Sequence, residues 1–122
     1  MAGRPIDVFN NGEMSRDFTY IDDTISAVVA ALEQPPGEAR EHRIYNIGNN
    51  RPETLLDFIA TLERALGRTA IRKMMPMQVG DVASTYADIE AARHDLGFEP
   101  KTSISEGIPK FIAWYREYHG LA

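Results

Sequence analysis

The stretch GEMSRDFTYIDD, at residues 12–23, decides how this sequence of 122 residues is interpreted. Its middle part, residues 16–20, predicts a short extended segment, in which Arg16 and Phe18 point to the same side because strand side chains alternate. The adjacent carboxylates of Asp22 and Asp23 mark a helix start, where they cap the helix and complement its dipole. Two carboxylates can instead share acid–base work in one pocket, but adjacency at a helix start favours capping. The apolar residues that follow keep helical spacing: Ile25, Val28, Val29 and Leu32.

Turn signals divide the chain on either side of this stretch into short elements. Residues 5–9 alternate as a strand does and end in NNG at 10–12, whose residue types tolerate positive φ. The first helix is stopped by PPG at 35–37, and the polar stretch 35–41 is expected to be an exposed loop. Residues 43–47 predict a further strand.

The centre of the chain predicts a second helix with a defined start and end. It begins near Thr54, where Asp57 three residues later gives a variant of the capping box, and Gly67 is the expected C′ residue. A strand over 70–75 and a loop over 76–84 follow.

Two more helices complete the chain. Asp88 is expected to cap a short helix over 89–96, which Gly97 closes. The last helix begins at SISE, residues 103–106, which fits a capping box, and runs to about Tyr118. The sequence therefore predicts a small mixed α/β (α+β) fold with three or four helices and short strands.

Composition limits the classes of protein that this sequence can encode. Apolar residues make up 43% and charged residues 25%, so we expect one globular domain over 1–122. The net charge of −5 argues against a nucleic-acid partner, and the lack of cysteine excludes disulfides and thiolate zinc sites. The three histidines have no metal-ligand spacing, so no metal is expected. No window approaches the roughly 20 apolar residues of a membrane span, and no apolar signal core is present, so we expect no membrane association and a cytoplasmic location.

The sequence lacks the usual motifs of catalysis and cofactor binding. It has no G-x-G-x-x-G fingerprint, no Tyr followed four residues later by Lys, no P-loop, and no serine or cysteine nucleophile with a histidine partner. On its own chemistry the chain is therefore a binding or structural domain with no catalytic residue of its own.

Several motifs nevertheless occur in order and together span essentially the whole chain. They are GEMSRDFTYIDD at 12–23, YNIG at 45–48, PMQVGDV at 76–82 and YAD at 86–88, followed by the terminal helix. This set resembles the carboxyl-terminal part of the extended short-chain dehydrogenase/reductase family, the NAD-dependent sugar-nucleotide epimerases and dehydratases. Within that family the sequence is most similar to UDP-glucuronate 4-epimerases.

The resemblance implies a division of labour between two parts of a longer enzyme. An amino-terminal Rossmann domain would hold NAD and the catalytic Tyr and Lys, and residues 1–122 would be the carboxyl-terminal subdomain that grips a UDP-sugar. The implied reaction moves hydride from C4 of the sugar to NAD and returns it to the other face of a 4-keto intermediate, which converts UDP-glucuronate to UDP-galacturonate. We expect this chain alone to be a fragment without the Rossmann domain, to bind no NAD and to be catalytically incompetent.

The resemblance assigns substrate roles to Arg16 and Asp81. Arg16 would take the diphosphate, and a guanidinium suits that role because its fork can donate two parallel charge-assisted hydrogen bonds. The alternative is a structural ion pair with Asp17 or Asp22. Asp81 would accept hydrogen bonds from the ribose hydroxyls, with a turn-forming aspartate as the alternative.

Phe18 and Gln78 complete the expected substrate residues. Phe18 matches a position beside the nucleoside, and the alternative is an ordinary core aromatic. Gln78 stands where several relatives carry a second phosphate-binding arginine. It can donate a hydrogen bond but carries no charge, so its departure puts strong diphosphate binding by that loop in question.

Two other functions remain open at this point. The same region of a nucleotide-sugar 4,6-dehydratase or decarboxylase would use the same nucleotide grip with different chemistry. A non-catalytic interaction domain would keep the shape without a partner domain. We also expect the fragment to expose apolar surface that the missing Rossmann domain would cover. Such surface tends to find partners, which include a second copy in a homodimer.

Overall fold

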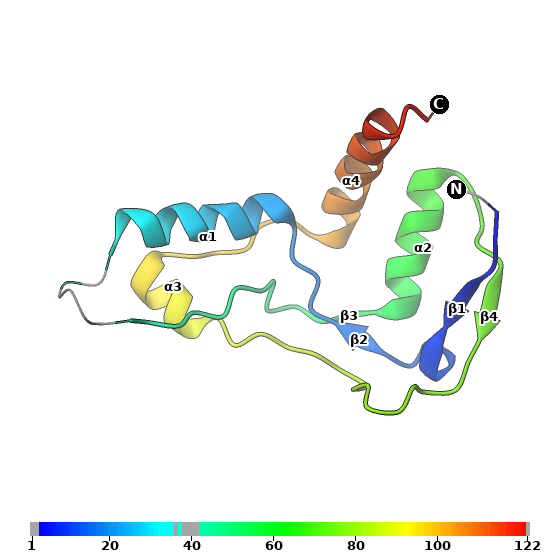
Figure 1. Ribbon diagram of the computed structural model, residues 1–122, viewed down its shortest axis with the longest axis horizontal. Coiled ribbons are helices and arrows are strands. Elements are labelled where there is room, and N and C mark those ends of the chain that lie inside the picture. The colour runs from blue at the N-terminus through cyan, green and yellow to red at the C-terminus, as the bar shows by residue number, and fades with distance from the viewer. Residues whose placement is uncertain (1–2, 36, 38–41, 122) are drawn as a thin grey trace.

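The computed structural model describes residues 3–35, 37 and 42–121 of the chain. Within these ranges the chain forms four α-helices and four short strands, and the molecule is elongated (Figure 1). The helices are α1 (Ile21–Glu33), α2 (Leu55–Leu66), α3 (Glu90–Leu96) and α4 (Ile104–Tyr118). The strands are β1 (Ile6–Val8), β2 (Ser15–Arg16), β3 (Glu53–Thr54) and β4 (Arg72–Met74). The predicted mixed α/β fold with three or four helices and short strands is therefore confirmed.

The strands form two separate two-stranded sheets. β1 pairs in parallel with β4, and β2 pairs antiparallel with β3, with Arg16 opposite Glu53. The expected NNG turn follows β1 as a short 3₁₀ segment, η1 (Phe9–Gly12), in which Asn10 and Asn11 have φ of 48° and 50°. These left-handed conformations are ones that asparagine tolerates better than most residues. The turn redirects the chain from one sheet into the other.

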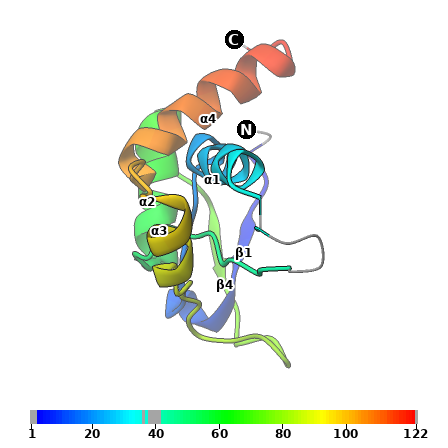
Figure 2. The same ribbon diagram turned by 90° about the vertical axis from the view of Figure 1, so that its left-hand side faces the viewer.

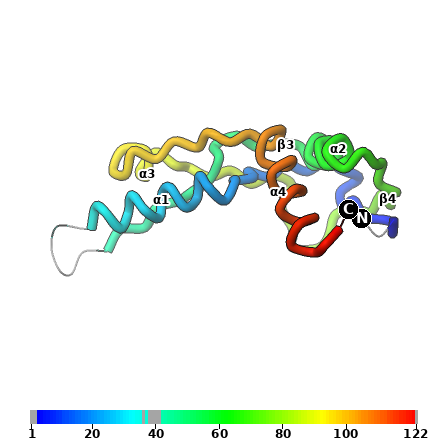
Figure 3. The backbone as a smooth tube through the Cα atoms, turned by 90° about the horizontal axis from the view of Figure 1, so that it is seen from above, coloured from blue at the N-terminus to red at the C-terminus, as the bar shows by residue number. Residues whose placement is uncertain are grey.

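The helices pack in two pairs at opposite ends of the molecule. α1 contacts α3 at one end, and α2 contacts α4 at the other, as Figures 1 and 3 show. The first pair shares a core cluster made of Ala27, Ile89, Ala92 and Phe98. None of the helices in the described ranges has both the length and the apolar character that a membrane crossing requires.

The start of α1 differs from the predicted one. The helix begins at Ile21, its N-cap is Tyr20, and no side chain caps it. Asp23 is instead buried, with 7% of its surface exposed, and its Oδ2 accepts hydrogen bonds from the backbone N–H groups of Lys101 and Thr102, at 3.2 and 2.9 Å. The capping role predicted for this carboxylate is therefore wrong, because a segment distant in sequence supplies the donors.

The apolar face predicted for α1 is on the outside of the described structure. Ala27 faces α3, and Figure 2 shows α3 packed against one side of the helix. The larger apolar residues are 45–76% exposed: Ile21, Ile25, Val28, Val29 and Leu32. We call these five residues the α1 apolar face. The helical spacing was predicted correctly, but the spacing alone does not say what the face packs against.

The predicted strand over 43–47 is also wrong. The segment pairs with no strand among the described residues, although Tyr45 and Ile47 pack against the core cluster. The hydroxyl of Tyr45 donates a hydrogen bond to Oδ2 of Asp95 at 3.0 Å. Side-chain contacts therefore fix the segment without a ladder of backbone hydrogen bonds. Hydrogen bonds from His94 and then Tyr45 lower the pKa of the Asp95 carboxyl. Most of the loop predicted over 35–41 lies outside the described residues.

Several predicted helix ends are confirmed, and β4 lies within the strand predicted over 70–75. Thr54 accepts a hydrogen bond from the Asp57 N–H, and Gly67 and Gly97 both close their helices with φ of 65°. The predicted Asp88 cap is wrong: Ile89 is the N-cap of α3 and no side chain caps the helix, although Asp88 accepts a hydrogen bond from the N–H of Glu90 at 3.0 Å. The last helix begins with the expected capping box.

Candidate functional site

The described structure brings two of the predicted substrate residues into direct contact. Arg16, at the end of β2, places its Nη2 atom 2.9 Å from Oδ1 of Asp81. The side chains of Arg16 and Asp81 are 26% and 31% exposed, so the pair is half-buried yet open on one side. The alternative partners expected from the sequence, Asp17 and Asp22, are not the ones that pair with Arg16 in this structure.

Backbone oxygens hold the other side of the Arg16 guanidinium. Its Nη1 atom donates to the carbonyl of Ser15 at 2.8 Å and to that of Ala83 at 3.4 Å. A guanidinium has five N–H donors, so these contacts and the ion pair orient the group while leaving donors for an acceptor outside the protein. An oriented guanidinium of this kind is suited to a phosphate or a carboxylate.

Asp81 is positioned by a segment that runs beside β2. The N–H of Ser15 donates to the carbonyl of Ala83 at 2.9 Å, and the N–H of Thr85 donates to the carbonyl of Ser15 at 3.2 Å. Asp81 itself lies in a turn, where its N–H donates to the carbonyl of Gln78 at 3.2 Å. The predicted loop over 76–84 thus places Gln78 and Asp81 at one turn, with the Gln78 side chain exposed.

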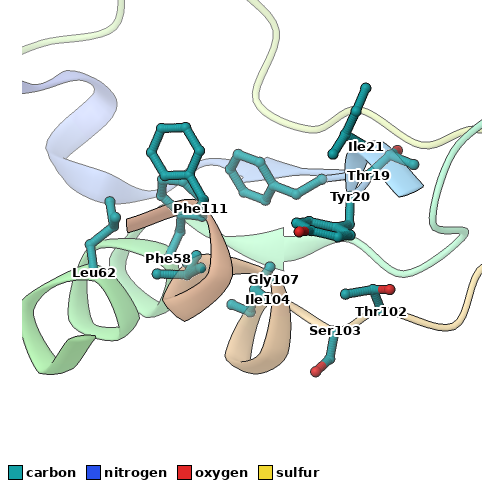
Figure 4. Close-up of a pocket in the computed structure, with 12 residues that line it drawn as sticks. Thr19, Tyr20, Ile21, Phe58, Leu62, Thr102, Ser103, Ile104, Gly107 and Phe111 are labelled. Atoms are coloured by element: carbon teal, nitrogen blue, oxygen red, sulfur yellow. The ribbon is translucent and has the colours of Figure 1, made fainter. Parts of the chain in front are cut away.

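Phe18 lies in a different environment from Arg16. Its ring stacks on the ring of Phe58 in α2, with ring centroids 4.1 Å apart and the planes at 11°. β2 ends at Arg16, so the alternation predicted over 16–20 does not extend to Phe18 within a strand. The stacked pair lines an apolar cleft of about 480 Å³. Its other walls come from residues 19–21, from Leu62 of α2 and from the segment 102–111 at the start of α4 (Figure 4). Arg16 and Asp81 are not among the residues that line this cleft.

The sequence analysis missed Asp17 as a residue that shapes the site. Its carboxylate accepts hydrogen bonds from the backbone N–H groups of Asn49, Asn50 and Ala87 at 3.0–3.1 Å, and from that of Arg51 at 3.4 Å. The only signal of this role in the sequence is that Asp17 directly follows Arg16. The donors lie 32 to 70 residues further along the chain, so no local pattern could have identified them.

The described residues do not form a metal site. Among residues 3–35, 37 and 42–121, no three histidine, aspartate or glutamate side chains gather around a position that could hold a metal ion. The site has one oriented guanidinium, one half-buried carboxylate and a neighbouring apolar cleft.

Comparison with known proteins shows which family this chain resembles. The model of the NAD dependent epimerase/dehydratase family matches residues 1–48. A probable UDP-glucuronate 4-epimerase of Rhizobium meliloti is 40% identical over 98% of this chain and 40% of that protein. UDP-glucuronate 4-epimerase 2 of Arabidopsis thaliana is 36% identical over 98% of this chain and 30% of that protein.

A solved structure shows the same fold. The UDP-glucuronic acid 4-epimerase of Bacillus cereus, in complex with UDP-glucuronic acid and NAD, is 33% identical and superposes with a TM-score of 0.82. The match covers 95% of this chain and 36% of that one. The chain is therefore similar in sequence and fold to part of the NAD-dependent epimerases and dehydratases. Within that family it is similar to UDP-glucuronate 4-epimerases, and it spans about 30 to 40% of the length of these relatives.

Proposed function

We propose that this chain forms the substrate-binding part of a UDP-sugar 4-epimerase, one that converts UDP-glucuronate to UDP-galacturonate through a 4-keto intermediate. The observation that carries the proposal is the contact between Arg16 and Asp81, which are 65 residues apart in the sequence and 2.9 Å apart in space. The similarity to UDP-glucuronate 4-epimerases over nearly the whole chain supports the choice of substrate.

The chemistry of a nucleoside diphosphate explains why these two residues should be neighbours. The ribose of UDP is joined directly to the first phosphate, so a group that binds phosphate and a group that binds ribose hydroxyls must lie close together. In the proposal, Arg16 donates to the diphosphate and Asp81 accepts from the ribose hydroxyls. Without a ligand, the two opposite charges stabilise each other and keep both side chains oriented.

The proposal gives Phe18 and Gln78 supporting roles. Phe18 lies beside the nucleoside, and its stacking on Phe58 fixes the orientation of the ring before a ligand binds. Gln78, at the same turn as Asp81, contributes a neutral hydrogen bond to the diphosphate. Arg16 then supplies the positive charge of the proposed grip, so its removal should affect binding strongly.

The described residues do not fit NAD, which the proposal assigns to the intact parent enzyme. A dinucleotide site needs a glycine-rich turn that leads from a strand into a helix. Here β1 leads through η1 into another strand, β2, and not into a helix. The chain after β2 does enter a helix, α1, but the first turn of α1 carries the carboxylates of Asp22 and Asp23. We therefore propose that residues 1–122 form one substrate-binding domain and that the NAD-binding domain belongs to a separate region of the parent.

The first test is the affinity of the chain for UDP. We expect weak binding by the unmodified chain, with a Kd of about 1 mM, equivalent to about 4 kcal/mol, because the proposed site is only one wall of a complete one. Arg16→Ala should weaken this binding at least about tenfold. The affinity of Arg16→Lys for UDP should lie between those of the unmodified chain and Arg16→Ala, because lysine keeps the charge but lacks the guanidinium fork. Isothermal titration calorimetry would measure all three affinities.

Arg93→Ala is the matched control for this test. It removes the same charge from α3, where Arg93 pairs with Glu90, and should leave UDP affinity unchanged. Micromolar binding of UDP that survives Arg16→Ala would show that the nucleotide site is elsewhere.

A second candidate function is a non-catalytic interaction domain, and the α1 apolar face favours it. Exposed apolar patches on soluble proteins commonly mark interaction sites. This candidate does not need a nucleotide, so the titration with UDP separates it from the first.

The α1 apolar face also predicts self-association of the isolated chain. We expect the weight-average mass in sedimentation velocity to rise with concentration, and Val28→Glu to reduce that rise because it places a charge in the middle of the face. Ala91→Glu, which adds the same charge at an exposed position of α3, should leave the rise intact. A strict monomer at high concentration would contradict the prediction.

A further inference from the structure

We infer that Asp17 is a positioning residue that holds Arg16 and Asp81 opposite each other. The inference concerns the geometry of the pair, and its consequence for UDP affinity rests on the function proposed above. Asp17 follows Arg16 directly at the end of β2, where the segments that carry the rest of the site meet.

The Asp17 carboxylate joins the two segments that flank β2. On one side it accepts from the N–H groups of Asn49 and Asn50, both at 3.1 Å, in the turn that leads into β3. On the other side it accepts from the N–H of Ala87 at 3.0 Å, at the far end of the segment that begins with Asp81. The backbone N–H of Asp17 also donates to Oγ1 of Thr85 at 3.3 Å. Both neighbours of β2 are thus tied to one side chain.

The turn at 49–51 is shaped to receive a negatively charged group. Asn50 has a φ of 54°, a left-handed conformation that lets successive backbone N–H groups converge on one acceptor. Converging backbone N–H groups form the concave anion-binding arrangement called a nest. Here the anion is the Asp17 carboxylate of the same chain, so the nest serves to hold β2 in place.

Gly48 shows how closely these segments approach one another. A Cβ atom on Gly48 would lie 2.8 Å from Oδ2 of Asp17 and 2.3 Å from the Cβ of Ala87. Both distances are too short for a real side chain, so the arrangement around Asp17 requires glycine at this position. The geometry of the nest therefore depends on backbone contacts as well as on the carboxylate.

This arrangement also keeps Asp17 from competing with Asp81 for the guanidinium of Arg16. A carboxylate next to Arg16 in sequence is a natural partner for the guanidinium, and that pairing would draw Arg16 away from Asp81. The four backbone N–H groups occupy both oxygens of Asp17 instead. Arg16 is then free to reach Asp81 and, in the proposed function, a diphosphate.

The test compares Asp17→Asn with Asp23→Asn in the full chain. Both changes replace a carboxylate that accepts backbone hydrogen bonds, but only Asp17 adjoins the Arg16–Asp81 pair. Asp17→Asn should move the side-chain N–H resonances of Arg16 in ¹⁵N NMR spectra toward those of an Asp81→Asn variant. It should also weaken UDP binding about tenfold. Asp23→Asn should lower the melting temperature while leaving the Arg16 resonances and UDP affinity as they are.

A milder variant keeps the test informative if Asp17→Asn does not fold. Thr85→Val removes the Oγ1 acceptor of the Asp17 N–H at an exposed position, and should shift the Arg16 resonances part of the way with the fold intact. Unchanged Arg16 resonances and UDP affinity in the folded variants would overturn the inference. If Asp17→Asn moves the resonances while neither it nor Arg16→Ala changes UDP binding, the positioning role stands and the proposed function fails.

Discussion

Replacing Phe98 with alanine should lower the free energy of unfolding by about 4 kcal/mol. The Phe98 side chain is 3% exposed and belongs to the core cluster with Ala27, Ile89 and Ala92. Truncation to alanine removes most of its buried apolar surface and leaves a cavity that the backbone around it can only partly fill. Urea denaturation followed by circular dichroism would measure the change.

The size of this effect follows from the small core of the described structure. The fully buried side chains of largest volume are Ile89 and Val8, so a lost phenyl ring has few neighbours that can compensate. A typical domain is stable by only 5–15 kcal/mol, so about 4 kcal/mol is a large share of the total. Phe111→Ala is the matched control. Phe111 is 48% exposed, and its loss should cost less than half as much. Equal costs for the two variants would show that Phe98 is not a core residue.

Replacing Asp23 with alanine should cost about 3 kcal/mol of unfolding free energy. The variant loses the two hydrogen bonds that the carboxylate accepts from Lys101 and Thr102. Hydrogen bonds to charged groups contribute about 1.5–3 kcal/mol each, and partial access of water to the freed N–H groups reduces the total. The same denaturation experiment would measure the effect.

Asp22→Ala provides a control from the same turn of α1. Asp22 is exposed and lies one residue earlier, so it experiences almost the same helix dipole. Its replacement should cost about 0.3–1 kcal/mol, the usual contribution of a charge at a helix start. If Asp22→Ala were as harmful as Asp23→Ala, the dipole would explain both effects, and the contact with residues 101–102 would not matter.

Local signals in the sequence predicted the helix ends well. The confirmed caps contact backbone groups within a few residues of their own position: Thr54, Gly67, Gly97 and the capping box at 103–106. A cap satisfies backbone groups that are close in sequence, so the residue types alone carry the information. The strands were predicted less well, because a strand exists only where a second segment supplies its hydrogen bonds. Residues 43–47 lack such a segment among the described residues and are fixed by Tyr45 and Ile47 instead.

The candidate site shows the same limit. Arg16 and Asp81 were singled out separately, and their roles toward a ligand remain predictions. Their contact depends on the segment that runs beside β2, and so do the hydrogen bonds of Asp17. The sequence also could not assign Asp23, because its donors lie 78 and 79 residues away. Carboxylates that accept distant backbone N–H groups have the same local sequence as carboxylates that cap helices.

The pairing of β1 with β4 has a consequence for how the chain reaches its structure. Ile6 lies opposite Arg72, Asp17 accepts from the N–H of Ala87, and Asp23 accepts from the N–H of Thr102, so these three contacts join residues about 65 to 80 positions apart. Contacts between segments so far apart require closure of long loops before they stabilise anything, which slows folding. During synthesis on the ribosome, residues 6–23 therefore gain these partners only after residues 72–102 have been made.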